Sequence, residues 1–425
     1  NKRNFIVHGS ILAIAGILVR IIGMLYRIPV VNIIGSEGNG IYGAAFNIYN
    51  IMLVLSSYGL PMAVSKLVSA RFTKKRYKSA AKVLRCSLMV AVCTGGIAAL
   101  LVFFGASFIE NVIYGGGLPG LAVPLRILAP TIFLVAILGV IRGFFQGQST
   151  MIPTAVSQIL EQIVNAIVSI AAGYGMMKAF ASSPDVAAYG AAVLFMGFLY
   201  AVYTPTFNRL KRKDRHTENQ STGQICKIII YTMIPIILGQ TFYQISALID
   251  DVMFSNIMVG RDITKSISMD LGNFSSSYSL LIGIPQGVAS AMSASMLPSV
   301  VASFTDRDYD SIYDKITKTL KTNMFIAVPS FVGLFVIGQP IIKLLFSRYN
   351  SAQGGMMLKI GAIAVVFYTL STVTSTALQG IDRVNVPMIH SSISLAVHIV
   401  LVFVLLKFSA LGIYAVVIGN ATFPI

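Results

Sequence analysis

The stretch that decides the fold is residues 86–109, CSLMVAVCTGGIAALLVFFGASFI, which contains no charged residue. At about 1.5 Å per residue, a helix of this length is longer than the roughly 30 Å hydrocarbon core of a bilayer. Similar stretches recur along the 425 residues, of which 56% are hydrophobic and 11% charged. Soluble domains carry about a quarter charged residues, so this composition excludes a soluble protein. We predict an all-α polytopic membrane protein.

Working outward from that stretch, the apolar segments predict about twelve spanning helices. We expect the last of them to continue beyond residue 425, because no polar tail follows it. The predicted spans are 5–31, 42–70, 80–108, 121–147, 152–177, 186–208, 225–258, 267–303, 316–345, 356–380, 384–406 and 409–425.

The basic residues that give the net charge of +17 gather in alternate short loops. They lie near the N-terminus and around residues 71–78, 209–215 and 315–321, whereas the loops around Glu37, Glu110 and Asp185 contain few. This distribution is the positive-inside pattern and predicts a cytoplasmic N-terminus. Since the membrane explains the charge, we expect no nucleic-acid partner.

Sequence motifs for catalysis and for metal binding are missing. The three cysteines, Cys86, Cys93 and Cys226, have neither zinc-site spacing nor an even count, and we interpret them as small apolar side chains. The glycines of residues 115–120 match a dinucleotide fingerprint by letter only, because no strand precedes them. With no nucleotide-binding lysine loop or zinc-protease helix, we expect no enzymatic activity and no cofactor.

An internal repeat divides the chain. Residues 72–77 recur at 304–309, an offset of 232, and Gln146-Gly147 recurs as Gln379-Gly380, an offset of 233. Residues 59–61, Gly-Leu-Pro, recur as Gly-Ile-Pro at 283–285, an offset of only 224. This difference predicts an insertion of about eight residues in the second copy, between residues 285 and 304.

The repeat predicts two six-helix bundles, an N-terminal one at 1–210 and a C-terminal one at 225–425, joined by a basic cytoplasmic linker at 211–224. Each copy has an even number of helices, so both have the same orientation in the membrane. A pseudo-two-fold axis along the membrane normal relates such halves, and substrates bind between them.

Two arginines in the first span predict an anion site. Arg20 and Arg27 are seven residues apart, which places them on one helix face about 10 Å apart along the axis. Two guanidinium groups on one wall suit a phosphate or pyrophosphate. The alternative is that one or both extend to lipid headgroups.

A polar stripe runs along the fifth span. Its members, spaced i, i+3, i+4 and i+7, are Gln158, Glu161, Gln162 and Asn165. The stripe lines either a substrate cavity or a hydrogen-bonded seam between helices. Glu161 could carry a proton or pair with an arginine, and we interpret Arg142 as an anchor that reaches the cytoplasmic headgroups.

The seventh span carries the adjacent carboxylates Asp250 and Asp251, with Asp251 on one face with Gln240 and Gln244. These carboxylates could bind a cation or titrate, or they could be solvated at a helix end. Further polar positions inside predicted spans are Asn47 and Asn50 in the second, Gln286, Ser290 and Ser293 in the eighth, and Ser391, Ser394 and His398 in the eleventh. His398 corresponds to Asn165 at the offset of 233.

Three motifs in residues 20–66 carry a family resemblance. They are Arg20-x-x-Gly23-x-x-x-Arg27, Gly35-x-Glu37-Gly38-x-Gly40-x-Tyr42 and Gly59-Leu60-Pro61-x-Ala63-x-Ser65-Lys66. The sequence resembles the stage V sporulation protein B and YtgP branch of polysaccharide-biosynthesis transporters. These belong to the multidrug/oligosaccharidyl-lipid/polysaccharide (MOP) flippase superfamily, with the lipid II flippase MurJ and the multidrug-extrusion (MATE) transporters.

The resemblance implies a MATE-like fold with a V-shaped central cavity in a bacterial cell membrane. It matches Arg20 and Arg27 to functional arginines of MurJ and Glu37 to the acidic residue between its first two spans. Two further MurJ arginines fall near Val54 and Ser279, where this chain has no basic residue. The departure leaves the exact substrate open.

The resemblance implies a monomeric flippase or exporter for an undecaprenyl-pyrophosphate-linked sugar, lipid II or a related cell-wall precursor. Residues expected to bind this lipid-linked substrate are Arg20, Arg27, Glu37, Asn47, Asn50, Gln158, Glu161, Gln162 and Asn165. Those expected to couple transport to Na⁺ or H⁺ are Asp250, Asp251 and Glu161. Two alternatives remain open: a cation-coupled multidrug antiporter, and a non-transporting scaffold for cell-wall or spore-coat assembly.

Overall fold

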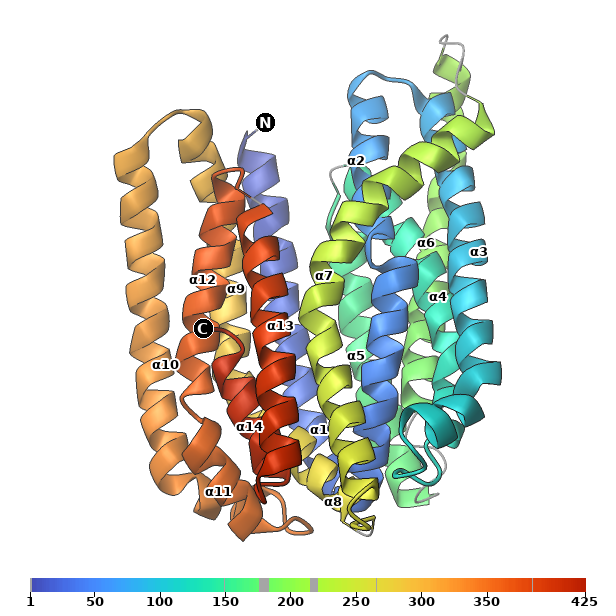
Figure 1. The fold of residues 1–425 in the computed structure, drawn as a ribbon. Helices are drawn as coiled ribbons and strands as arrows, with labels where there is room; N and C mark the ends of the chain where they lie inside the picture. Colours follow the sequence, from blue (N-terminus) through green and yellow to red (C-terminus); the bar gives the residue numbers. More distant parts are fainter. Residues whose placement is uncertain (1, 149, 176–182, 215–220, 265, 384) are drawn as a thin grey trace. The chain divides into compact units, whose positions relative to one another are not determined.

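The computed structural model describes residues 2–148, 150–175, 183–214, 221–264, 266–383 and 385–425. The described residues form helices joined by short turns, with no strand among them (Figure 1). The helices are α1 (Lys2–Leu53), α2 (Leu60–Thr73), α3 (Tyr77–Phe108), α4 (Ala122–Gly147), α5 (Ile152–Gly175), α6 (Ser183–Lys213), α7 (Thr222–Val259), α8 (Ile267–Gly272), α9 (Ser279–Thr305), α10 (Tyr309–Leu345), α11 (Ser351–Gly361), α12 (Ala364–Gly380), α13 (Asn385–Phe408) and α14 (Ile413–Thr422). Three π-helical turns lie beside them: η1 (Val54–Tyr58), η2 (Ile109–Ile113) and η3 (Asn273–Tyr278).

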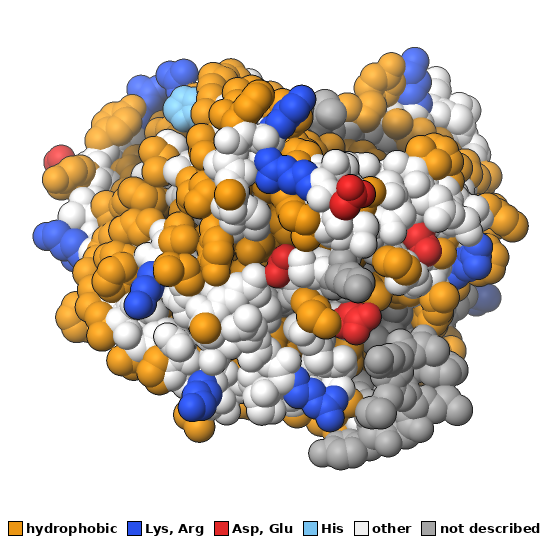
Figure 2. Space-filling view, turned by 60° about the horizontal axis from the view of Figure 1, so that its bottom comes forward, with side chains coloured by type: hydrophobic (Ala, Val, Ile, Leu, Met, Phe, Trp, Pro, Cys, Tyr) orange, Lys and Arg blue, Asp and Glu red, His pale blue; other side chains and the backbone are white. Residues whose placement is uncertain are grey.

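Long apolar helices confirm a polytopic membrane protein. Within the described residues, eight helical stretches are long and apolar enough to cross a bilayer, or nine with the bent pair α11–α12. This is fewer than the predicted twelve. One of the eight, Leu25–Thr73, has 49 residues and would measure about 74 Å as a straight helix, more than twice a bilayer core. Large apolar side chains are exposed along these helices, and Figure 2 shows them across the face that it draws.

The break predicted between the first two spans is present, but it is one residue long and not a loop over residues 32–41. Two helical stretches, both within the bounds of α1, meet at Gly35, whose backbone has φ 79° and ψ 174°. A left-handed φ is accessible to glycine without steric cost, so one residue can break the helix where a longer turn was expected. Asn39 stabilises the bend, since its Nδ2 donates to the carbonyl oxygens of Val31 (3.1 Å) and Gly35 (2.8 Å).

By its contacts, the chain forms two compact units. Unit 1 comprises Asn1–Tyr26, Ala45–Ser107 and Ala122–Gln244, and unit 2 comprises Arg27–Ala44, Phe108–Leu121 and Ile245–Ile425. Both α1 and α7 therefore contribute residues to each unit. The sequence halves 1–210 and 225–425, with their linker at 211–224, stay a prediction.

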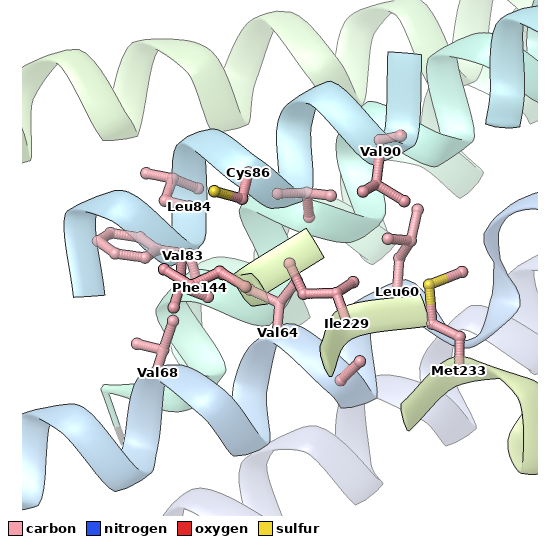
Figure 3. Close-up of a cluster of buried hydrophobic side chains, with 14 of the residues drawn as sticks. Leu60, Val64, Val68, Val83, Leu84, Cys86, Val90, Phe144, Ile229 and Met233 are labelled. Atoms are coloured by element: carbon pink, nitrogen blue, oxygen red, sulfur yellow. The ribbon is translucent and has the colours of Figure 1, made fainter. Parts of the chain in front are cut away.

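Unit 1 has an apolar core in which α2, α3, α4, α6 and α7 meet (Figure 3). Leu60, Val64 and Val68 line one face of α2, spaced by one helical turn, and are fully buried. Phe144 of α4 and Phe207 of α6 pack edge-to-face, with 5.3 Å between their ring centres. The i, i+4, i+8 spacing on α2 explains why this helix has a buried face.

Equivalent contacts recur in the two units at the offsets seen in the sequence. Val68 packs against Gly147 in unit 1, and Val300 packs against Gly380 in unit 2. The turns that follow α2 and α9 also correspond, because Lys75 and Arg307 both have a left-handed φ, of 54° and 58°. Residues 232 or 233 positions apart thus occupy the same place in each copy.

Unit 2 also contains a close crossing of two helices, and the internal repeat relates one of these helices to the other. A Cβ atom on Gly40 of α1 would overlap the carbonyl oxygen of Ser268, and one on Gly272 of α8 would overlap that of Ser36. Ser36 and Ser268, like Gly40 and Gly272, are 232 positions apart. Each of the two crossing helices therefore presents the same small-x-x-x-small pattern, which lets the two helix backbones touch.

The predicted eight-residue insertion is wrong. The offset is 232 at Gly40 and Gly272, and again at Val68 and Val300, so no net insertion separates them. The Gly-Leu-Pro match at 224 has no structural counterpart. Gly59 lies against Met233, whereas a Cβ on Gly283 would meet no atom within 4 Å.

The crossing predicts a strong penalty for any side chain at its centre. Gly40→Ala and Gly272→Ala each place a methyl group on a backbone carbonyl that cannot move aside. Overpacking of this kind costs about 1–3 kcal/mol. We expect each variant to unfold at a lower temperature than the parent, measured by circular dichroism at 222 nm in detergent.

Gly283→Ala and Gly333→Ala are the controls, since both glycines are helical and have open space where the methyl group would go. Alanine favours a helix by up to about 1 kcal/mol over glycine, so these variants are neutral or more stable. Equal melting temperatures for all four variants would contradict the close crossing.

Candidate functional site

The polar stripe of α5 lies in unit 1, with its members at different depths. Glu161 and Asn165 are buried, whereas Gln158 and Gln162 are half-buried. Gln162 lies beside Gly23 of α1, with its Oε1 3.5 Å from where a Cβ would stand. The predicted one-sided stripe is thus present, and helices α4 and α6 supply partners for its buried members.

Glu161 pairs with Arg142 of α4. The Nη2 atom of Arg142 donates to Glu161 Oε2 over 2.9 Å, and its Nε donates to Ser157 Oγ over 2.9 Å. The two charged side chains are 13% and 10% exposed. The interpretation of Arg142 as a headgroup anchor is therefore wrong, because a buried carboxylate one helix away attracts the guanidinium inward.

Asn165 connects α5 to α6. Its Nδ2 donates to Asp185 Oδ1 over 3.0 Å, and its Oδ1 accepts from Ser169 Oγ over 2.9 Å. Donor and acceptor are both satisfied, as a polar side chain in hydrocarbon requires. Glu161 and Asn165 therefore bind two neighbouring helices, and the half-buried Gln158 and Gln162 are the members left open to a ligand.

The residues predicted around the first two spans fall in both units. The side chain of Arg20 lies outside those that the structure describes. In unit 2, Arg27 and Glu37 are exposed. In unit 1, Asn47 and Asn50 are half-buried. The role of these five in substrate binding stays a prediction.

The charge of Arg27 faces a polar cluster that the sequence did not reveal. Its positive field reaches the hydroxyl of Tyr349, which lies after α10. That hydroxyl also accepts from Asn39 Nδ2 over 2.7 Å, and its single hydrogen is shared between the carbonyl oxygens of Val31 and Gly35 at the α1 bend, 3.2 and 3.1 Å away. The only sequence signal was Asn39 itself, within the glycine-rich segment.

The carboxylate pair of α7 is buried in unit 2. Asp250 and Asp251 are 4% and 5% exposed, so the interpretation as a solvated helix end is wrong. Asp251 lies near Tyr114, which follows η2. Gln244 is exposed, and the side chain of Gln240 lies outside those described.

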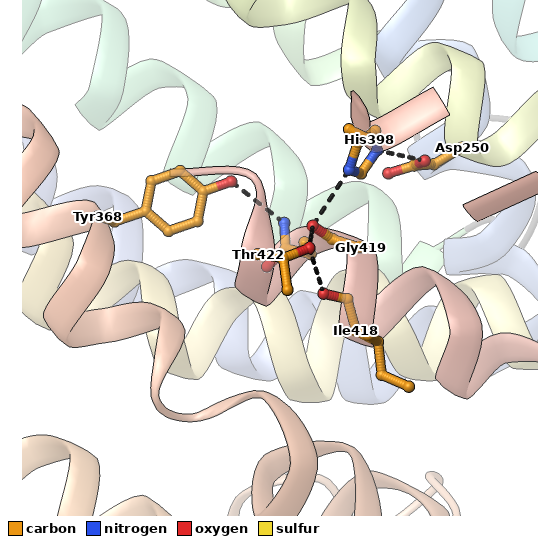
Figure 4. A network of polar contacts seen from close by, with 7 residues as sticks. Asp250, Tyr368, His398, Ile418, Gly419 and Thr422 are labelled. Carbon is orange, nitrogen blue, oxygen red and sulfur yellow. Dashed lines mark hydrogen bonds and ion pairs between the residues drawn. The ribbon is translucent and has the colours of Figure 1, made fainter. Parts of the chain in front are cut away.

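Asp250 is joined to α13 through His398 (Figure 4). The Nε2 atom of His398 lies 2.7 Å from Asp250 Oδ1, and its Nδ1 atom lies 3.1 Å from the carbonyl oxygen of Gly419 on α14. The ring packs edge-on against Phe423, with 5.3 Å between ring centres. His398 was not among the predicted site residues, although its correspondence with Asn165 marked the position.

Comparison with known proteins decides the family. The profile of the polysaccharide biosynthesis protein family matches residues 7–304, about 70% of the chain. The chain belongs to this family. The MatE family profile also matches, over residues 235–404. The family and the fold agree with those implied by the motifs in residues 20–66.

Relatives extend over nearly the whole chain. The lipid II flippase MurJ of Bacillus subtilis (strain 168) is 27% identical over 417 residues, which cover 93% of this chain and 76% of that protein. Stage V sporulation protein B of the same organism is 24% identical over 431 residues, covering 99% of this chain and 81% of that protein.

Solved structures share the fold of this chain. An inward-facing multidrug resistance MATE family transporter of that superfamily has a TM-score of 0.75 to this chain at 15% identity. The match covers 98% of this chain and 94% of the transporter. At that identity the likeness is one of fold. It confirms the MATE-like, all-α fold class predicted from the sequence.

The Arg142–Glu161 pair predicts a large coupling energy. Glu161→Leu or Arg142→Met alone leaves one buried charge without its counter-charge, which costs about 3–5 kcal/mol. The double variant Arg142→Met/Glu161→Leu removes both charges, and we expect it to regain most of that stability. Chemical or thermal unfolding in detergent measures all three in a double-mutant cycle.

The exposed pair Lys318–Asp314 on α10, whose side chains are 74% and 57% exposed, is the matched control. Asp314→Asn changes stability by less than about 1 kcal/mol. If the two single variants in the buried pair behave like this control, the pair does not stabilise unit 1.

Proposed function

We propose that this protein is a flippase that moves an undecaprenyl-pyrophosphate-linked sugar, lipid II or a related cell-wall precursor, from the inner to the outer leaflet. The observation that carries the proposal is the match to a lipid II flippase across 93% of the chain, within a family of polysaccharide biosynthesis proteins. The relatives named above are transporters or sporulation proteins. The proposal therefore assigns transport and no catalysis.

Charge supports this substrate class. Arg20 and Arg27, in the first span, would bind the pyrophosphate, and Arg27 is exposed and so open to a ligand. The half-buried amides Gln158, Gln162, Asn47 and Asn50 would bind the sugar. One charge crossing 100 mV gains about 2.3 kcal/mol, so a diphosphate with about two charges gains roughly 4–5 kcal/mol on leaving a negative interior.

An inward-moving cation would then reset the carrier. Of the three carboxylates expected to couple transport to this ion, Glu161 is already paired with Arg142, and Asp250 lies 2.7 Å from the ring of His398. The proposal places coupling at the buried neighbours Asp250 and Asp251. The protein would work as a monomer in the bacterial cell membrane, with its N-terminus in the cytoplasm.

A cation-coupled multidrug antiporter is the second candidate. The MatE profile over residues 235–404 and the similarity to a MATE transporter favour it. Such a protein needs buried acidic groups, which Asp250 and Asp251 provide, and does not need the arginines of the first span.

Translocation of labelled lipid II in proteoliposomes tests the proposal. We expect transport by the wild type to increase with an inside-negative membrane potential. We expect Arg20→Ala/Arg27→Ala to reduce the rate by about a hundredfold, because loss of about 1.4 kcal/mol of anion binding per arginine is a factor of ten each.

Arg126→Ala is the matched control, since Arg126 is an exposed arginine of α4 that bonds Ser107 Oγ over 2.8 Å. Its variant should transport at the wild-type rate. Full activity of the double arginine variant at normal protein levels would contradict the anion site. Transport of cationic drugs but not of lipid II would favour the antiporter.

A further inference from the structure

We propose that Asp250 and His398 hold one transferable proton, and that this proton is the ion that couples transport. The inference rests on the proposed function for its transport role and on the geometry of unit 2 for the proton itself. It replaces the open choice between Na⁺ and H⁺ with a specific pair of side chains.

The position of the proton follows from hydrogen-bond chemistry. A carbonyl oxygen only accepts, so the Nδ1 atom of His398, 3.1 Å from the Gly419 oxygen, must carry a hydrogen. A neutral imidazole then has a bare lone pair on Nε2. That lone pair faces Asp250 Oδ1 at 2.7 Å, and an ionised carboxylate is also an acceptor.

Two acceptors at hydrogen-bond distance require a proton between them. The contact exists either as imidazolium with carboxylate or as imidazole with carboxylic acid, and in both forms the pair holds one proton more than imidazole and carboxylate apart. When that proton leaves toward one side of the membrane, two lone pairs face each other and α7 loses its bond to α13. Proton binding is therefore linked to a contact between helices.

The surroundings fix the ring in this orientation. Gly419 is in close contact with it, since a Cβ there would lie 2.9 Å from His398 Cε1 and 3.2 Å from Nδ1. Phe423 covers the ring edge-on, and the carbonyl oxygen of Gly419 also accepts from the Phe423 amide over 2.9 Å. The ring cannot flip to offer Nδ1 to the carboxylate without losing the bond to α14.

Sodium is a poorer occupant of the same place. A sodium ion needs several oxygen ligands around it, and one oxygen of Asp250 is already within 2.7 Å of an imidazole nitrogen. The contact between this carboxylate oxygen and a ring nitrogen therefore suits a shared proton.

The other half of the chain provides the comparison. Asn165, which corresponds to His398, bonds Asp185 of α6 through an amide that does not titrate. Asp185 itself corresponds to residue 418, next to Gly419. The same helix pair is thus joined in both units, and only in unit 2 does a titratable ring make the bond.

Other titratable groups lie on the pair's own helices and on those around it. Tyrosines ordinarily titrate near pH 10, and the two lysines on neighbouring helices, Lys359 and Lys407, are exposed. His390 on α13 is also exposed. The groups on the elements packed around the pair are Asp251 on α7, Tyr114 after η2, Asp270 on α8, Tyr278 in η3, Tyr368 on α12 and Tyr414 on α14.

Nitrogen-15 NMR of the histidines tests the proton directly. The full chain has four, at positions 8, 216, 390 and 398, and His398→Asn assigns the signal of His398 by its loss. We expect Nδ1 of His398 to carry a hydrogen and Nε2 to share the extra proton with Asp250 at pH values well above about 6.5, the ordinary pKa of an imidazole. In Asp250→Asn the ring of His398 should be neutral at the same pH.

A ring in the Nε2–H form, or one that titrates with the other histidines whether or not Asp250 is present, would overturn the proposal. This readout needs no transport. If it succeeds while the wild type fails to move lipid II, the proton site stands and the proposed function fails.

Transport rates under a pH gradient measure the coupling between proton movement and substrate movement. A gradient of about one pH unit, acidic outside, is a tenfold ratio of proton activity and should raise the wild-type rate by up to about tenfold. His398→Asn copies the residue at the equivalent position of the first repeat and should abolish the response to the gradient. His390→Asn, on the same helix, should keep it.

Replacing sodium by choline should leave the wild-type rate unchanged. A rate that depends on sodium and ignores the pH gradient would overturn the coupling role, even with lipid II transport intact.

Discussion

A polar side chain placed in hydrocarbon must find its partner inside the protein, and this constraint organises both units. Arg142 and Glu161 satisfy each other between α4 and α5. Asn165 and Asp185 join α5 to α6, and His398 joins α7, α13 and α14. The apolar surfaces of these helices face lipid as easily as protein, so the polar bonds and the close backbone contacts decide which helices are neighbours.

The repeat gives these bonds a common geometry with different chemistry. Val68 packs against Gly147 in the same way as Val300 packs against Gly380. The residues at the corresponding positions 165 and 398 each form a hydrogen bond to the following helix. The first copy uses an amide, which does not itself titrate. The second uses an imidazole, whose bond to a carboxylate requires a proton. Corresponding positions thus bond through a group that does not titrate in one unit and through a titratable ring in the other.

Much of the candidate site was predictable, because the helical periodicity of polar residues and their charge can be read from short stretches of sequence. The stripe of α5 follows from helical spacing alone, and the correspondence of His398 with Asn165 follows from the repeat. The direction of Arg142 did not follow, since an arginine near a span end can reach water or a buried carboxylate with similar ease. The burial of Asp250 and Asp251 was also hidden, because His398, which bonds Asp250, lies 148 residues further along the chain.

By itself, the sequence determined that the chain crosses a membrane many times, that it repeats, and that it belongs to the polysaccharide biosynthesis protein family. Apolar run length, an offset of about 232 and local motifs carry that information. Only the tertiary structure decided where α1 bends, that no insertion interrupts the repeat, and which acid meets which base. Those outcomes depend on contacts between distant segments, and a glycine or an aspartate has the same letter whether or not a partner lies against it.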